Sequence, residues 1–164
     1  MEYVRKNIVH LDDHSSYTNG VFNTIDPKQN KYFFQAFKHP DEAFNYIITS
    51  LATDARIDLI IADINHPGKQ GLDFASDVKA LTESYGIKIP FMILSMMVPA
   101  PLNHQNKKEF MLIKGELEKK HEKYPALIRR FLEYLDNGCV QSFLGKDSSP
   151  EKIVLEMERL FKYW

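Results

Sequence analysis

The sequence predicts an α/β fold whose core is a doubly wound parallel sheet of five strands in the order 2-1-3-4-5. Short apolar segments alternate with helical patterns along most of the 164 residues, which is typical of strands joined by crossover helices. The segment at 57–62 is apolar on both faces except at Asp58, as expected for a strand that helices cover on each side. Acidic residues end two of the apolar segments, at the sheet edge where parallel folds place their chemistry.

Five apolar segments predict the strands, at residues 8–11, 31–37, 57–62, 89–94 and 139–144. Between the first four strands, helical spacing predicts helices at 15–25, 41–51 and 71–85. Ser15 or Ser16 is expected to cap the first of these helices. The last helix is predicted at 151–163, with Ser148 and Glu151 at capping-box spacing.

The stretch between the fourth and fifth strands is too long for one connection. Residues 96–106 are expected to be irregular, because prolines interrupt them. A charged helix is predicted over 109–124, and Pro125 then starts a second helix that Gly138 ends. The apolar residues that share one face of the charged helix are Phe110, Ile113 and Leu117. We therefore expect a single domain over residues 1–164, with a helical insertion at about 98–126.

Composition and charge limit the classes of partner and the cellular compartment that we expect. The net charge of −1 provides no general attraction to nucleic acid or to an anionic membrane. Cys139 is the single cysteine, which excludes an internal disulfide and favours a reducing compartment. No apolar run approaches the roughly 20 residues of a membrane helix, and the start of the chain does not have the pattern of a signal peptide. We expect a cytoplasmic protein that contacts neither membrane nor nucleic acid directly.

Polar side chains follow four of the five predicted strands. Asp12 and Asp13 follow the first strand, Asp63 the third, Ser95 the fourth and Lys146 the fifth. Three carboxylates at one sheet edge repel one another, and a hard divalent cation such as Mg²⁺ is the usual resolution. A carboxylate can accept a phosphoryl group, while a hydroxyl and a lysine can contact its oxygens. The set therefore predicts a Mg²⁺-dependent aspartate that accepts phosphate.

These motifs resemble the receiver domain of bacterial two-component response regulators, which has a flavodoxin-like fold. The matching segments are Asp12-Asp13-His14, Asp63-Ile64-Asn65-His66-Pro67-Gly68 followed by Gly71-Leu72, Ser95, and Gly145-Lys146-Asp147-Ser148-Ser149-Pro150-Glu151. The resemblance covers roughly residues 5–97 and 127–163, and therefore most of the chain.

The resemblance implies a role for each matching residue. Asp63 would be the phosphoacceptor, Ser95 and Lys146 would contact the phosphoryl group, and Ser95 and Phe143 would move on activation. The residues that would bind Mg²⁺ are Asp12, Asp13, Asp63 and, through its backbone carbonyl, Asn65. The partner would be a sensor histidine kinase, and catalysis would be limited to self-phosphorylation and slow autodephosphorylation, so the chain is not expected to be an enzyme. The resemblance leaves open a homodimer and an output domain absent from this chain.

Three features depart from the usual receiver pattern. His66 stands where an apolar residue is common, and Asp147 follows Lys146 where many members have proline. Asp147 and the Asp12-Asp13-His14 motif are similar to the subgroup with LuxR-type helix-turn-helix outputs. The insertion is the largest departure, because it lies beside the region through which receivers signal.

Two other functions stay open from the sequence. The first is a phosphate-independent interaction module that holds a partner through the insertion. The second is a small phosphohydrolase with an aspartate nucleophile, although Asn65 stands where haloacid-dehalogenase-type enzymes usually carry a second acid. Taken singly, Asp12 and Asp13 could also be helix caps, and His14 is expected to be an exposed residue at the helix start.

Overall fold

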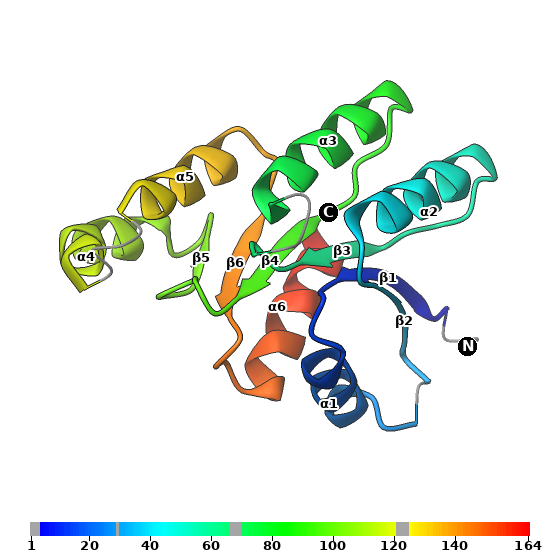
Figure 1. The fold of residues 1–164 in the computed structure, drawn as a ribbon, viewed down its shortest axis with the longest axis horizontal. Helices are drawn as coiled ribbons and strands as arrows, with labels where there is room; N and C mark the ends of the chain where they lie inside the picture. Colours follow the sequence, from blue (N-terminus) through cyan, green and yellow to red (C-terminus); the bar gives the residue numbers. More distant parts are fainter. Residues whose placement is uncertain (1–3, 29, 66–69, 121–124) are drawn as a thin grey trace.

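The structure is a computed structural model that describes residues 4–28, 30–65, 70–120 and 125–164. Its centre is a six-stranded sheet in the order β2-β1-β3-β4-β6-β5, between two layers of helices (Figure 1). The strands are β1 (Lys6–Leu11), β2 (Tyr32–Phe37), β3 (Leu59–Ala62), β4 (Phe91–Ser95), β5 (Leu102–Asn103) and β6 (Ser142–Gly145). The helices are α1 (Ser15–Ile25), α2 (Pro40–Ala52), α3 (Gly71–Ser84), α4 (Lys107–Lys120), α5 (Pro125–Asp136) and α6 (Pro150–Tyr163).

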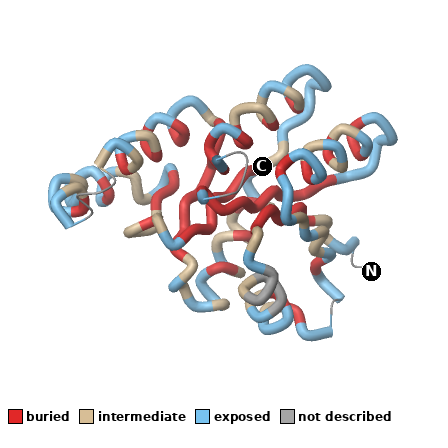
Figure 2. The backbone as a smooth tube through the Cα atoms, in the orientation of Figure 1, coloured by how far each residue is buried: buried red, intermediate tan, exposed pale blue. Residues whose placement is uncertain are grey.

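The predicted doubly wound fold is confirmed. The strands from β2 to β6 in the sheet order are all parallel, and β6 takes the place of the predicted fifth strand. Helices α1 and α6 cover one face of the sheet, and α2, α3 and α5 cover the other. The most buried residues therefore lie in the central strands of the sheet (Figure 2).

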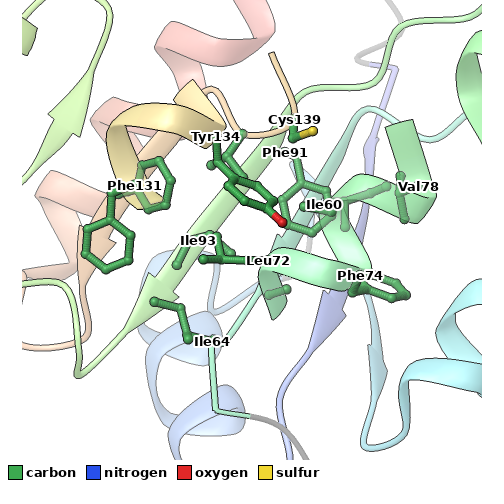
Figure 3. Packing of buried hydrophobic residues seen from close by; sticks show 14 of the residues in the cluster. Ile60, Ile64, Leu72, Phe74, Val78, Phe91, Ile93, Phe131, Tyr134 and Cys139 are labelled. Carbon is green, nitrogen blue, oxygen red and sulfur yellow. The ribbon is translucent and has the colours of Figure 1, made fainter. Parts of the chain in front are cut away.

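Alternate residues of the central strands supply two separate cores, as the period of a strand requires. Ile60 and Ile93 face α2, α3 and α5, where Phe74 and Phe131 join the larger core (Figure 3). The smaller core, against α1 and α6, takes its residues from the opposite strand positions, including Ile8, Leu59, Ile61, Met92, Leu94 and Leu144. Both faces of β3 and β4 are buried, which fixes the ends of these strands firmly in space.

Strand β5 is a feature that the sequence did not predict. Residues 96–106 were expected to be irregular, but Leu102 and Asn103 pair antiparallel with Phe143 and Ser142 of β6. Asn106 supports the turn that follows, because its Oδ1 accepts a hydrogen bond from the backbone N–H of Asn103 at 2.7 Å. Two residues are too short to show a strand period, so this pairing depends on long-range register rather than on local pattern.

Both helices predicted between the fourth and fifth strands are present: α4 begins two residues before the predicted 109, and its predicted end at 124 lies outside the described residues, while α5 begins at Pro125 as predicted and ends before Gly138. Helix α5 packs on the sheet, while α4 packs on α5 through the buried residues Phe110 and Leu117. Ile113 was expected on the same face but is 41% exposed, since a single neighbouring helix covers only a narrow seam. Glu118 of α4 contacts Arg129 Nε of α5 at 2.9 Å, which joins the two helices, and Lys114 Nζ of its own helix at 3.2 Å. None of the described helices is long and apolar enough to cross a membrane.

The N-cap residues of α1 and α6 lie one or two positions away from the serines predicted for them. His14 holds the N-cap position of α1 instead of Ser15 or Ser16, because the chain turns earlier, where Asp12 Oδ1 accepts the His14 N–H at 2.8 Å. At α6 the cap is Ser149 rather than Ser148, and its Oγ accepts the backbone N–H of Lys152 at 3.3 Å.

Candidate functional site

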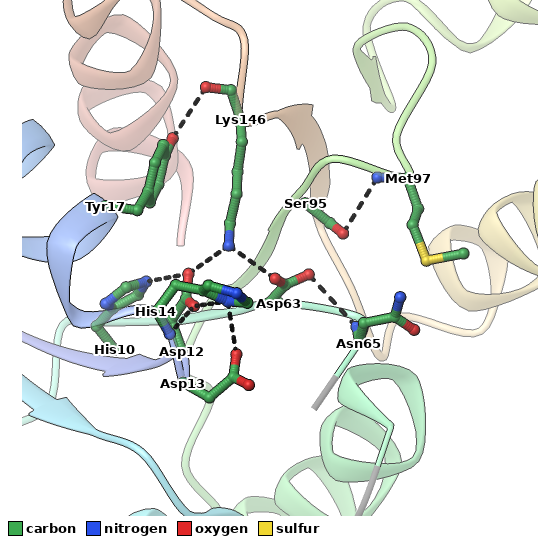
Figure 4. A network of polar contacts seen from close by, with 10 residues as sticks. All are labelled: His10, Asp12, Asp13, His14, Tyr17, Asp63, Asn65, Ser95, Met97 and Lys146. Atoms are coloured by element: carbon green, nitrogen blue, oxygen red, sulfur yellow. Dashed lines mark hydrogen bonds and ion pairs between the residues drawn. The ribbon is translucent and has the colours of Figure 1, made fainter. Parts of the chain in front are cut away.

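The predicted site residues converge at the carboxyl ends of β1, β3, β4 and β6 (Figure 4). This convergence follows from the parallel topology, because each of these strands ends at the same edge of the sheet. A pocket of about 310 Å³ opens there. Its lining residues are His14, Tyr17, Asp63, Asn65, Ser95, Met96, Met97 and Lys146.

Lys146 forms the centre of the site. Its Nζ lies 2.6 Å from Asp12 Oδ2 and 2.7 Å from Asp63 Oδ2, and the three side chains are 6%, 0% and 8% exposed. Burial alone would lower the pKa of Lys146, but hydrogen bonds to Asp12 and Asp63 and the charges of both carboxylates raise it above its ordinary value. The lysine is therefore held as a cation between two carboxylates.

Tyr17 of α1 holds the lysine from the other side. Its hydroxyl donates to the backbone carbonyl of Lys146 at 3.2 Å, and the Lys146 Nζ lies 4.8 Å from the centre of its ring. Burial, followed by the charges of Asp12, Asp147 and Asp63, raises the pKa of Tyr17 to about 12. The phenol therefore stays protonated and keeps its donor role. No motif in the sequence singled out Tyr17, which was expected only as part of the helix at 15–25.

Asp63 is fixed by the backbone around it. Its N–H donates to the Leu11 carbonyl at 3.1 Å, and the Asn65 N–H donates to its Oδ1 at 3.4 Å. Gly71, at the start of α3, donates its N–H to the Ile64 carbonyl at 2.9 Å. A Cβ on Gly71 would lie 2.0 Å from the Asp63 carbonyl oxygen, so this close approach requires glycine. Residues 66–69, which include His66, Pro67 and Gly68 of the receiver-like motif, lie outside the described residues.

The three residues after β1 form an acidic corner with an imidazole in it. Asp12 is buried, Asp13 is 30% exposed in its side chain, and the His14 side chain is 70% exposed. His14 Nδ1 lies 2.8 Å from Asp13 Oδ1 and 3.6 Å from Asp12 Oδ1. The expected exposure of His14 is therefore observed, but its ring also faces the carboxylates, which sequence spacing could not indicate.

His10 lies beneath this corner. It is buried, with its Nε2 4.0 Å from Asp12 Oδ2 and its ring against the edge of Phe22. Neither ring nitrogen has a hydrogen-bond partner among the described residues. Burial, and then the charge of Lys146, lower the pKa of His10 to about 3 against the opposing charge of Asp63. A neutral imidazole therefore supports Asp12 from below.

The two predicted switch residues occupy different positions. Ser95 is buried, lines the pocket and accepts the Met97 N–H on its Oγ at 3.3 Å. Phe143 lies outside the pocket, fully buried, with its ring centre 4.8 Å from that of Phe131 in α5. The pair Ser95 and Phe143 therefore spans the distance from the pocket to the helix that precedes β6.

The charges at this edge do not balance. Asp12, Asp13 and Asp63 supply three negative charges, and Lys146 supplies one positive charge. Ligand atoms from Asp12, His14 and Asp63 lie within 4.8 Å of one another, so they are close enough to share one ion. Carboxylate oxygens are the ligands that Mg²⁺ prefers, and the described residues therefore fit a divalent cation.

The fold resembles several solved receiver domains. The chemotaxis response regulator CheY4 of Vibrio cholerae is 19% identical with a TM-score of 0.59, over 96% of this chain and 99% of that one. The receiver domain of HemR from Leptospira biflexa is 18% identical with a TM-score of 0.59, over 98% and 97% of the two chains. The phosphorylated cyanobacterial phytochrome response regulator RcpA is 16% identical with a TM-score of 0.57, over 98% and 94%. At these identities the likeness shows the fold. No family model and no curated protein matches the chain.

Proposed function

We propose that this chain is a phosphorylation-dependent signalling switch of the receiver type, in which a sensor histidine kinase transfers a phosphoryl group to Asp63. The observation that carries this proposal is the position of Lys146 between Asp12 and Asp63 at the carboxyl edge of the sheet. The receiver fold supports it independently.

In the proposed transfer, an oxygen of the Asp63 carboxylate attacks the phosphorus of a phosphohistidine. An acyl phosphate bond forms, the phosphorus–nitrogen bond breaks, and the electron pair leaves on the imidazole nitrogen. Lys146, already bonded to Asp63 Oδ2, can follow the negative charge onto the phosphoryl oxygens. The Ser95 hydroxyl, which lines the same pocket, can donate to another of them. The same groups would support slow autodephosphorylation and no other turnover.

The donor set of the site fits Mg²⁺. We propose Asp12, Asp13, Asp63 and the backbone carbonyl of Asn65 as the residues that would hold it. The bound ion would neutralise negative charge on the transferring oxygens. The chain's own part is to fix these acids, which it does through the Asp12 bond to the His14 N–H and the Asp63 bond to the Leu11 carbonyl.

We propose that phosphorylation at the site is signalled to the rest of the domain through β6 and α6. Phe143 on β6 packs against Phe131, and Ser142 on the same strand donates to Glu156 of α6. Glu156 also accepts a hydrogen bond from Asn103 Nδ2 of β5 at 3.1 Å. Through Asn103 the insertion is thus hydrogen-bonded to α6, on the face that would change on phosphorylation. We propose that the insertion takes part in the output.

We further propose that residues 1–164 form one receiver domain that acts in the cytoplasm, with the insertion at about 98–126 as part of it. Other partners in this proposal are a second copy of the chain or a separate output domain. The similar structures do not support the narrower likeness to the LuxR-type subgroup, which stays a prediction from Asp147 and the Asp12-Asp13-His14 motif.

Intact-mass measurement after incubation with acetyl phosphate and Mg²⁺ tests this function. We expect a single phosphoryl adduct that disappears in Asp63→Asn and in metal-free buffer. Asp41→Asn, which changes an exposed acid on α2, is the matched control and should keep the adduct. An adduct on Asp63→Asn would remove Asp63 from the role. A folded wild-type protein that forms no adduct would instead favour the phosphate-independent interaction module.

A further inference from the structure

The imidazole of His14 is the feature at this edge that the phosphorylation chemistry does not use. We propose that His14 supplies a nitrogen ligand to the metal site, which therefore binds borderline transition-metal ions such as Co²⁺ more tightly than Mg²⁺. This inference rests on the proposed metal site and adds to it a residue and a class of metal. It begins from the position of the ring, whose Nδ1 faces the carboxylates of Asp12 and Asp13.

The spacing of the ligand atoms supports a shared ion. Metal–oxygen and metal–nitrogen bonds are about 2.0–2.2 Å, so two ligands of one ion lie roughly 3 to 4 Å apart. His14 Nδ1 lies 3.6 Å from Asp12 Oδ1 and 2.8 Å from Asp13 Oδ1. Ligand atoms of Asp12, His14 and Asp63 all fall within 4.8 Å of one another. Small side-chain adjustments would therefore bring the imidazole and the acids onto one ion.

Lys146 and His14 act on different oxygens of Asp12. The lysine lies 2.6 Å from Oδ2, whereas His14 lies near Oδ1, which also accepts the His14 backbone N–H at 2.8 Å. An ion on the His14 side would thus leave the contact between Lys146 and Asp12 Oδ2 in place. That backbone hydrogen bond also fixes His14 relative to the carboxylate, while its largely exposed side chain can turn without disturbing the core.

The chemistry of the ligands determines the expected preference. A site made of carboxylates, carbonyls and water favours Mg²⁺, whereas an imidazole nitrogen favours later first-row ions. Because Asp13 Oδ1 lies beside the same ring nitrogen, His14 Nδ1 and Asp13 Oδ1 would both become ligands of the ion, and their direct contact would be replaced by two metal bonds. One nitrogen among oxygen ligands would keep Mg²⁺ binding and increase the affinity for Co²⁺.

The test is to titrate the full chain, without an affinity tag, separately with Co²⁺ and Mg²⁺ at pH 7.5 by calorimetry. We expect wild type to bind Co²⁺ more tightly than Mg²⁺. His14→Ala should weaken Co²⁺ binding about tenfold or more and Mg²⁺ binding less than about twofold. His104→Ala removes an exposed histidine beyond β5 and should change neither affinity. In the proton NMR spectrum of the Co²⁺ complex, a strongly shifted imidazole N–H should appear in wild type and vanish in His14→Ala.

The outcomes separate this inference from the proposed function. If His14→Ala weakens both metals equally and no shifted imidazole signal exists, His14 merely positions its acidic neighbours and the inference is overturned. If His14→Ala leaves Co²⁺ affinity unchanged while wild type forms the Asp63 adduct with Mg²⁺, the inference fails and the function stands. If wild type binds neither ion and forms no adduct, both are wrong.

Discussion

The ammonium group of Lys146 lies 2.7 Å from Oδ2 of Asp63, although the strands before these two residues are not neighbours in the sheet. Strand β4 separates them, so the lysine crosses the end of that strand to reach the acid. A buried ion pair stabilises a protein chiefly when every charge in it is matched. Asp12 adds a second carboxylate to the same ammonium group, and the cluster keeps excess negative charge that a cation can neutralise.

Replacing Lys146 should reveal the excess negative charge of the cluster as a loss of stability. We expect Lys146→Met to lower the free energy of unfolding by about 3 kcal/mol at pH 7.5, because two buried carboxylates lose their counter-charge. Urea denaturation measures the loss, and Lys152→Met, at an exposed position of α6, is the control. Adding Mg²⁺ should restore more stability to Lys146→Met than it adds to wild type. Equal effects of Mg²⁺ on both proteins would contradict a metal site at these acids.

Gly71 should be intolerant of any side chain. The new Cβ in Gly71→Ala would meet the Asp63 carbonyl oxygen, so the backbone of either α3 or β3 must shift. We expect a loss of about 2 kcal/mol or more in urea denaturation, together with slower formation of the Asp63 adduct. Gly115→Ala in α4 meets open space and should stabilise the protein by up to about 1 kcal/mol. Similar stabilities of the two variants would show that the contact at Asp63 is not tight.

Asp26 should make stability depend on acid pH. Its carboxylate accepts backbone N–H groups of Asn30, Lys31 and Tyr32 at 3.2, 2.9 and 2.8 Å. Burial opposes its charge, but these three hydrogen bonds and the charge of Arg5 lower the pKa of Asp26 below its ordinary value of 3.8. A lowered folded-state pKa gives stability that is present above the unfolded-state pKa and is lost as pH falls through the folded-state value.

We therefore expect Asp26→Asn to cost about 1 to 2 kcal/mol at pH 7 and pH 5, since the charge-assisted bonds are lost. The difference from wild type should shrink once the pH drops below 3.8. Urea denaturation at pH 7, 5 and 3 measures it. Asp41→Asn, at an exposed position, should stay within about 0.5 kcal/mol of wild type throughout. A difference that grows toward pH 3 would reverse the assigned direction of the pKa.

Glu156 should control how firmly the insertion is held. Burial opposes its charge, but hydrogen bonds from Arg159 and Ser142, the charge of Arg159 and the bond from Asn103 lower the pKa of Glu156. Glu156→Ala removes the contact between α6 and β5, so hydrogen exchange should speed up about tenfold in residues 102–120. Glu158→Ala, on the same helix, loses contacts with Lys31 and Tyr32 and should affect β2 instead. Unchanged exchange in the insertion would show that other contacts hold it.

The sequence predicted the central sheet well because each of its parallel strands is a short apolar segment, and polar residues that mark the strand ends follow four of them. The same pattern brought Asp12, Asp63, Ser95 and Lys146 to one edge, where the structure places them. This part of the site depends on strand order alone, which local patterns and handedness rules determine.

The remaining features depend on contacts between distant segments. Strand β5 forms because Leu102 pairs with Phe143 of β6, and no pattern within the insertion predicts that pairing. The ring of His14 faces Asp13 because the turn after β1 ends one residue before the predicted serine cap. The burial of His10 without hydrogen-bond partners among the described residues likewise depends on tertiary structure.

Strand β5 also changes what the sheet offers to other molecules. An open parallel sheet normally ends in exposed strands, and an unpaired strand edge can recruit a further strand from another chain. Here a two-residue antiparallel strand pairs with β6 and offers too short a template for such recruitment. The longer strand β2 ends the sheet on the opposite side. Strand addition from another chain is therefore favoured at β2, on the side of the sheet away from Phe143 and Glu156.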